Sequence, residues 1–208
     1  MPIVDKFVKK QNFASYEDFY ENFKVEIPEN FNFAFDVMDE LAREKPGETA
    51  LVWCDERGAE ASFTYSELKS LSNQAANVLR RAGVKKGDPV MLILKRRWEY
   101  WIVLLALHKI GAIAIPATHL LTVKDIVYRC KAADIIGVIC VDEAITQRVE
   151  EAHAKLLSEG NAVLRFKAFV RSVHHAKDTP LSAPPAAADS LASWLDFKAL
   201  LREESSAF

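Results

Sequence analysis

Residues 89–116 read PVMLILKRRWEYWIVLLALHKIGAIAIP. The apolar run from Pro89 to Leu94 predicts a strand, and Ala112 to Ile115 predicts a second strand that ends at Pro116. Between them, Trp98 to Lys109 predicts a helix that is apolar almost all round and is therefore buried. Short apolar strands that alternate with helices pair in parallel through right-handed crossovers. This stretch therefore predicts a doubly wound α/β fold.

The same alternation continues toward the C-terminus. We expect a helix at Thr122 to Ala133, a strand at Ile135 to Val141, a helix at Glu143 to Leu157 and a strand at Ala162 to Val170. Thr122 and Asp125 have the spacing of a helix N-terminal cap. The expected fold class is thus α/β, with a doubly wound, mostly parallel sheet and flanking helices.

Two strands and a helix with clear start and stop signals are predicted upstream of residues 89–116. Thr49 to Cys54 and Ala61 to Thr64 predict strands on either side of a turn. Thr64 and Glu67 match a capping box, in which each side chain accepts a hydrogen bond from a free backbone N–H of the other residue. Gly83 stands where a left-handed cap would end that helix. This helix is the best defined in the sequence.

The ends of the chain have a different composition. Aromatic residues at helical spacing predict a short amphipathic helix from about Ser15, and a second helix is expected from Phe33 to Lys45. Leu191 to Glu204 predicts a last helix. We expect four regions: an N-terminal helical extension at 1–30, an α/β subdomain at 31–175, a proline- and alanine-rich linker at 176–190 and a terminal helix at 191–208.

Composition limits the possible partners. The net charge of −2 gives no general attraction to nucleic acid. No apolar run approaches the roughly 20 residues that span a bilayer, and the first residues do not resemble a signal peptide. The three cysteines are not closely spaced, which favours a reducing compartment and three buried thiols. We therefore expect a cytoplasmic protein.

Motifs for catalysis are absent from the residues themselves. Gly83 and Gly87 follow a helix and precede a strand, whereas a phosphate loop needs the strand first. His174 and His175 are adjacent, a poor arrangement for a metal chelate. The basic cluster Lys95-Arg96-Arg97 follows a strand, where ligands of α/β sheets bind, but a solvated turn explains it as well. We therefore predict neither a catalytic residue nor a metal site.

Several ordered motifs resemble the AMP-forming acyl-CoA synthetases. They are Phe63-Thr64-Tyr65-Ser66-Glu67-Leu68, Leu71-Ser72-Asn73-Gln74-Ala75-Ala76-Asn77, Gly87-Asp88-Pro89-Val90, Arg96 with Trp98-Glu99-Tyr100-Trp101, and Leu107-His108-Lys109-Ile110-Gly111-Ala112-Ile113-Ala114-Ile115-Pro116. Residues 30–37, Asp125 to Arg129 and Trp194 to Phe197 resemble the medium-chain branch in particular. The resemblance covers nearly the whole chain apart from residues 150 to 190.

This resemblance implies a two-step reaction in the complete enzyme. A carboxylate attacks the α-phosphate of ATP to give an acyl-adenylate and pyrophosphate, and the CoA thiol then displaces AMP, with Mg²⁺ and basic groups stabilising the anionic charge. Such enzymes are more than twice as long, and their phosphate loop would begin shortly after Phe208. We therefore expect an incomplete N-terminal part of the synthetase large domain, inactive alone; the resemblance implies ATP, Mg²⁺ and CoA for the complete enzyme.

The resemblance also suggests four positions that approach CoA. Thr118, His119 and Leu120 match the loop where medium-chain relatives approach CoA, although Leu120 replaces their glutamine. Arg148 lies near a region where acetyl-type relatives place arginines against CoA phosphates. An ordinary turn and a solvated helix face are the alternatives for these residues.

A second hypothesis treats the chain as a standalone non-catalytic module that binds a nucleotide, CoA or a protein. An incomplete fold would expose apolar surface, which favours self-association. An unrelated nucleotide-binding α/β domain is a third possibility, but no phosphate motif supports it.

Overall fold

The computed structural model describes residues 2–56, 58–141, 144–161, 164–170 and 194–208. Five parallel strands form the central sheet, in the order β4-β3-β5-β6-β7. Their bounds are β3 Pro89–Ile93, β4 Ile113–Pro116, β5 Gly137–Val141, β6 Phe166–Val170 and β7 Leu195–Asp196. The doubly wound, parallel α/β plan expected from the sequence is confirmed.

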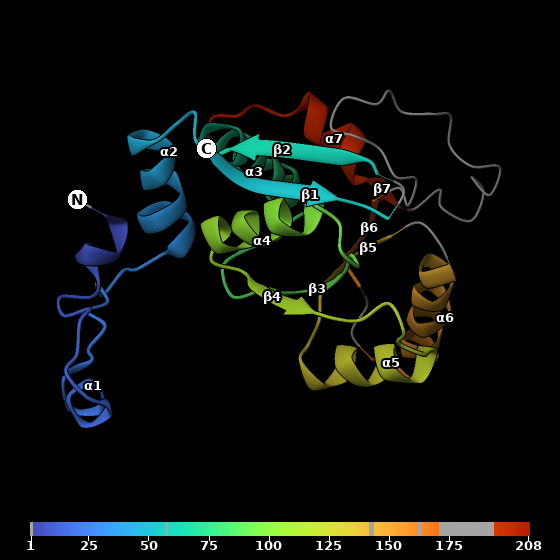
Figure 1. Cartoon of the computed structure of the whole chain (residues 1–208). Coiled ribbons are helices and arrows are strands. Elements are labelled where there is room, and N and C mark those ends of the chain that lie inside the picture. The colour runs from blue at the N-terminus through green and yellow to red at the C-terminus, as the bar shows by residue number, and fades with distance from the viewer. Residues whose placement is uncertain (1, 57, 142–143, 162–163, 171–193) are drawn as a thin grey trace.

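Helices cover both faces of this sheet (Figure 1). They are α3 Tyr65–Arg81, α4 Glu99–Ile110, α5 Val123–Ala132, α6 Ala144–Ser158 and α7 Phe197–Glu203. The buried side chains of α3, α4 and α7 form one apolar cluster with one face of the sheet. Those of α5 and α6 form a second cluster with the other face. Every residue of β5 and β6 is buried, as expected for strands between two helical layers.

A separate antiparallel hairpin consists of β1 Thr49–Cys54 and β2 Glu60–Thr64. It packs against the first apolar cluster through Trp53 and the fully buried Phe63. The predicted capping box is confirmed at the start of α3, where Glu67 N–H donates to Thr64 and Thr64 N–H donates to Glu67. The same arrangement joins Thr122 and Asp125 at α5. Gly83 has the expected left-handed backbone, with φ of 87°.

The N-terminal arm lies apart from the helices that flank the sheet (Figure 1). It contains a 3₁₀ turn, Ile3–Lys6, and α1, Tyr16–Asn22, and none of residues 2–30 is buried. The next predicted helix begins as a π-helix, Ala34–Asp39, and continues as α2, Glu40–Glu44.

Two expectations are wrong. The helix predicted at Leu191 to Glu204 is wrong at Leu195 and Asp196, which pair with β6 as the short strand β7; among the described residues α7 begins at Phe197. Cys54 is exposed rather than buried, whereas Cys130 and Cys140 are buried. The end of β4 at Pro116, opposite Leu92, is as expected.

Two further expectations lie outside the described residues: the linker at 176–190 and the pair His174-His175. Within the described part of the chain, no helix is long and apolar enough to cross a membrane.

Candidate functional site

The candidate site lies at the carboxyl ends of the central strands. From β3 the chain crosses to β4 on one side, whereas from β5 it crosses to β6 on the other side. Such a reversal of strand order opens a crevice beyond the carboxyl ends of the two strands, where α/β sheets bind ligands. Here the crevice is bordered by Lys95 after β3, by the loop 117–122 after β4 and by the first turns of α6.

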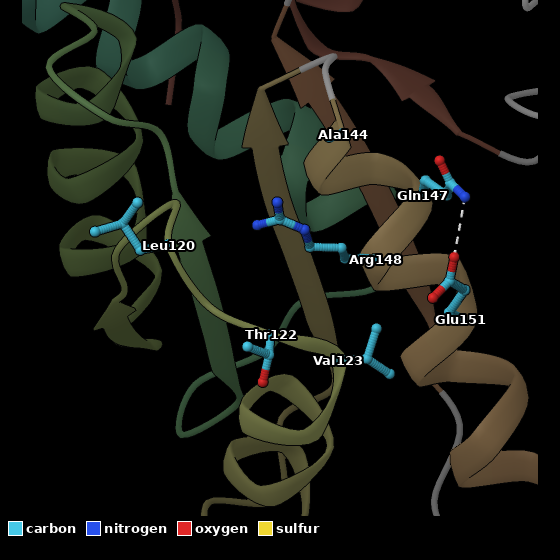
Figure 2. Close-up of a pocket in the computed structure, with 7 residues that line it drawn as sticks. All are labelled: Leu120, Thr122, Val123, Ala144, Gln147, Arg148 and Glu151. Atoms are coloured by element: carbon cyan, nitrogen blue, oxygen red, sulfur yellow. Dashed lines mark hydrogen bonds between the residues drawn. The ribbon is translucent and has the colours of Figure 1, made fainter.

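Arg148 joins two of these borders. Its Nη1 donates to the carbonyl oxygens of His119, at 3.2 Å, and Leu121, at 3.1 Å. Figure 2 shows the Arg148 side chain extending from α6 toward the segment that carries Leu120. Arg148 itself is half-buried, whereas Leu120 is 72% exposed. The arginine therefore fixes the loop, while Thr118, His119 and Leu120 are exposed to solvent.

Two hollows flank this loop. The first, of about 430 Å³, is lined by Leu120, Thr122, Val123, Ala144, Gln147, Arg148 and Glu151. The second, of about 390 Å³, is lined by Leu92, Leu94, Lys95, Tyr100, Pro116, Ala117, Thr118 and His119. Each hollow contains one basic side chain, Arg148 or Lys95, so both can receive an anionic group.

Local hydrogen bonds hold the loop at both of its ends. The Leu120 N–H donates to Thr118 Oγ1 at 3.3 Å. At the other end Thr122 N–H and Oγ1 donate to Asp125 Oδ2 at 2.9 and 2.7 Å. These donors lower the pKa of Asp125, with the backbone N–H of Thr122 as the largest cause. The loop is thus preorganised by its own short-range contacts.

The structure brings together the four residues that the family resemblance suggested. Thr118, His119 and Leu120 form the exposed part of the loop, and Arg148 reaches its backbone from a helix 29 residues away from His119. Lys95 belongs to the basic cluster that the sequence placed where α/β sheets bind ligands, whereas Gln147 and Glu151 were not indicated as lining residues. The left-handed backbone of Lys95, with φ of 52°, has no sequence signal because lysine rarely adopts it.

The basic cluster after β3 is not a simple solvated turn. Arg97 is only 5% exposed, and its Nη2 lies 3.3 Å from the fully buried Glu99 carboxylate. Its guanidinium also lies 6.0 Å from the Trp53 ring centroid. The expectation of solvation is therefore wrong for Arg97, while Lys95 and Arg96 are exposed.

The described residues contain no group of three or more His, Cys, Asp or Glu side chains that could hold a metal ion. The basic groups of the site are suited to phosphate oxygens rather than to a cation.

Comparison with known proteins places the fold in a family. A family model described as "AMP-binding enzyme" matches residues 38–195. The human acyl-coenzyme A synthetase ACSM3, mitochondrial, is 36% identical over 181 residues, which cover 81% of this chain and 31% of the relative. The mouse acyl-coenzyme A synthetase ACSM4, mitochondrial, is 35% identical over 185 residues, with 86% and 28% covered. The chain thus spans about a third of the length of these curated relatives.

Solved structures agree on the fold. Acetoacetyl-CoA synthetase from Streptomyces lividans has a TM-score of 0.66 at 21% identity, over 84% of this chain and 25% of that chain. An acyl-CoA synthetase of Brucella canis has a TM-score of 0.64 at 21% identity, over 86% and 28%. Because the family model matches well over half of its residues, the chain belongs to the AMP-binding enzyme family.

Proposed function

We propose that this chain is the N-terminal part of an AMP-forming acyl-CoA synthetase. The complete enzyme would convert a carboxylic acid, ATP and CoA, with Mg²⁺, to acyl-CoA, AMP and pyrophosphate. The observation that carries this proposal is the family match, which is supported by similarity to acyl-coenzyme A synthetases along 81% of the chain. The resemblance of its motifs to the medium-chain branch favours a fatty acid as the carboxylic acid.

Residues 1–208 alone act in this proposal as a scaffold without catalytic activity. The described crevice offers Lys95 and Arg148 for anions but no glycine-rich loop at the start of a helix, the usual cradle for ATP phosphates. ATP–pyrophosphate exchange with short and medium carboxylates tests this directly. No exchange above a buffer blank is expected, and turnover by the 208-residue chain would show that the scaffold role is wrong.

CoA is the ligand proposed for the crevice. Arg148 donates to the loop carbonyls through Nη1 alone, and its other guanidinium donors have no acceptor among the described residues. A guanidinium presents several donors in one plane, which matches phosphate oxygens. Thr118, His119 and Leu120 would then contact the rest of the CoA molecule at the mouth of the hollows.

Titration calorimetry with CoA tests this site. Arg148→Ala should weaken binding at least about tenfold, since a charge-assisted hydrogen bond contributes about 1.5–3 kcal/mol. Gln147→Ala is the matched control, because Gln147 lines the same hollow but hydrogen-bonds to Glu151 at 3.0 Å. Equal affinities of the wild type and Arg148→Ala would exclude Arg148 as a phosphate ligand.

A second candidate is a standalone binding module that associates with itself or with another protein. The observation that favours it is the exposed apolar surface of the N-terminal arm, where Tyr16, Tyr20 and Ile27 are 71%, 76% and 64% exposed. Sedimentation of the 208-residue chain separates the two ideas. A monomer at all concentrations would count against self-association.

The four-region division and a cytoplasmic location belong to the same proposal. All three cysteines are free, which is consistent with a reducing compartment. The ACSM relatives named above carry the word mitochondrial in their names. Cell fractionation with an antibody against this chain would distinguish the two compartments.

A further inference from the structure

Residues 204–207 lie along α3 and are held there by side-chain amides. Gln74 Nε2 donates to the carbonyl of Glu204 at 3.0 Å, and Asn73 Nδ2 donates to that of Ser206 at 2.8 Å. Asn77 Nδ2 donates to the carbonyls of Ser205, at 3.0 Å, and Ala207, at 2.8 Å. Four consecutive carbonyl groups are thus bound by three amides on one helix. We call Asn73, Gln74 and Asn77 the amide row.

Side chains hold the two ends of the same segment. Arg81 forms an ion pair with Glu204, whose side chain is 7% exposed. At the other end, the Phe208 ring lies 5.5 Å from the Arg80 guanidinium and stacks on Phe35 with centroids 6.4 Å apart. Figure 1 shows the chain running from α7 past α3 to this end. The segment is therefore recognised by side chains at its ends and through its backbone in the middle.

The orientation of the Asn73 amide is fixed by a hydrogen bond from Lys109. Lys109 Nζ, on α4, donates to Asn73 Oδ1 at 2.5 Å, and the Lys109 side chain is completely buried. An ammonium group can only donate, so Oδ1 must face Lys109 and Nδ2 must face Ser206. Asn73 is itself only 7% exposed. The amide row is thus a built surface and not a chance contact of flexible side chains.

The serine side chains contribute little to this recognition. Ser205 Oγ accepts from the Ala207 N–H within the segment, at 3.0 Å, and no bond joins either serine side chain to α3. Backbone carbonyls are present in any residue, so this pattern tolerates changes in the middle of the segment.

We propose that this face of α3 is a peptide-binding surface for an extended segment with a carboxylate at its first position and an aromatic ring at its fifth. Arg81 selects the carboxylate, Arg80 and Phe35 select the ring, and the amide row binds the backbone between them. Its occupant is residues 204–208 of the same molecule. The surface lies on the face of the sheet covered by α3, away from the hollows beside α6, and it does not depend on the proposed synthetase function.

Release of Phe208 by a carboxypeptidase tests the proposal on the 208-residue chain. The double variant Gln74→Glu/Asn77→Asp keeps the size of both side chains but replaces their donors with acceptors. It should release Phe208 at least about tenfold faster, because three hydrogen bonds are lost. Ser206→Ala is the matched control, since it removes a side chain and keeps the carbonyl, and it should match the wild type. Circular dichroism and the thermal midpoint confirm that each variant is folded.

A blocked peptide tests the chemistry of the occupant. Acetyl-Glu-Ser-Ser-Ala-Phe-amide at millimolar concentration should speed release of Phe208 by competing with the attached segment, whose effective concentration is also millimolar. Acetyl-Arg-Ser-Ser-Ala-Ala-amide should have no effect. Unchanged release in the double variant, or faster release in Ser206→Ala, would overturn backbone recognition. A dimer that dissociates in the double variant would overturn the intramolecular assignment.

Discussion

Lys109 and Asp39 form an ion pair in which Nζ lies 2.8 Å from Oδ1 and the lysine side chain has no exposed surface. The pair connects α4 to the π-helix at Ala34–Asp39, and Lys109 also donates to Asn73 on α3. The Phe35 ring lies 5.6 Å from the same ammonium group. One buried charge thus ties three segments of the fold together. Burial lowers the pKa of Lys109, while Asp39 acts to raise it.

Replacing this charge should destabilise the protein strongly. Lys109→Met leaves Asp39 and Asn73 without their buried donor and should lower the free energy of unfolding by about 3 kcal/mol. Asp39→Asn keeps an acceptor oxygen but removes the anion beside the buried ammonium group, so it should also cost about 3 kcal/mol. Urea denaturation measures both changes. Equal stability of Lys109→Met and the wild type would show that the pair is not a structural link.

The buried carboxylate of Glu99 lies beside two buried cations and should be important for stability. It lies 3.3 Å from Arg97 Nη2 and 3.6 Å from Lys198 Nζ, and all three side chains are at most 6% exposed. Glu99→Ala should cost about 3–5 kcal/mol, because the buried Lys198 ammonium group loses the carboxylate beside it and Arg97 loses one of its contacts. Leu105→Ala, a nearby apolar truncation on α4, is the control for simple loss of packing. A smaller effect of Glu99→Ala than of Leu105→Ala would contradict this account.

The same cluster predicts a dependence of stability on alkaline pH. Burial lowers the pKa of Lys198 below 10.5, and Glu99 opposes this shift. Between its folded pKa and 10.5 the unfolded chain binds more protons at this lysine, so the free energy of unfolding rises with pH in that window. Glu99→Ala removes the opposing charge, so the rise should begin at a lower pH. Denaturation curves at several pH values, with Glu99→Ala/Lys198→Met as control, would measure it.

Gly137 should not tolerate a side chain. A Cβ at this position would lie 2.0 Å from Cε1 of Phe166, its direct partner on β6, a distance that real contacts do not reach. Gly137→Ala should therefore lower the thermal midpoint by several degrees, as overpacking costs about 1–3 kcal/mol. Gly137→Ala should lower the thermal midpoint less in the Phe166→Leu background than in the wild type, because the smaller side chain leaves room for the added methyl group. Additive losses in this double-mutant cycle would show that the ring is not the cause.

The three thiols should differ widely in reactivity. Cys54 is exposed on β1, whereas Cys130 is buried and its pKa is raised to about 11 by that burial. A thiol reagent at pH 8 should modify one cysteine rapidly and the other two only after unfolding, since the thiolate is the reactive form. Cys54→Ser should abolish the rapid phase. A rapid phase that persists in this variant would place a second thiol at the surface.

Local signals explain which elements the sequence predicted well. The helices that begin at Thr64 and Thr122 have complete capping boxes within four residues, so nearby residues alone determine their starts. Strand β7 was missed because its two residues are defined only by pairing with Ala168 and Phe169 on β6. Cys54 was expected to be buried on the general habit of cysteine, but β1 is half exposed.

The candidate site was predictable to a smaller extent. The family resemblance suggested the loop 118–120 and Arg148, and the structure shows that they are in contact. No pattern in the sequence reveals that Arg97 is buried. Its guanidinium lies near the ring of Trp53, and it shares the Glu99 carboxylate with Lys198; Trp53 and Lys198 are both distant in the sequence. Contacts between residues far apart in sequence are set by the assembled fold and carry no local signal.

The stacking of Phe35 on Phe208 has a consequence for the order in which the chain folds. These rings join segments near opposite ends of the sequence, and their contact needs α3 and α4 to be in place first. A contact that closes so long a loop stabilises the protein only after the intervening chain has lost its conformational entropy. The contact between Phe35 and Phe208 should therefore form last during folding. For the same reason it should open first when the protein is heated, ahead of the parallel strands.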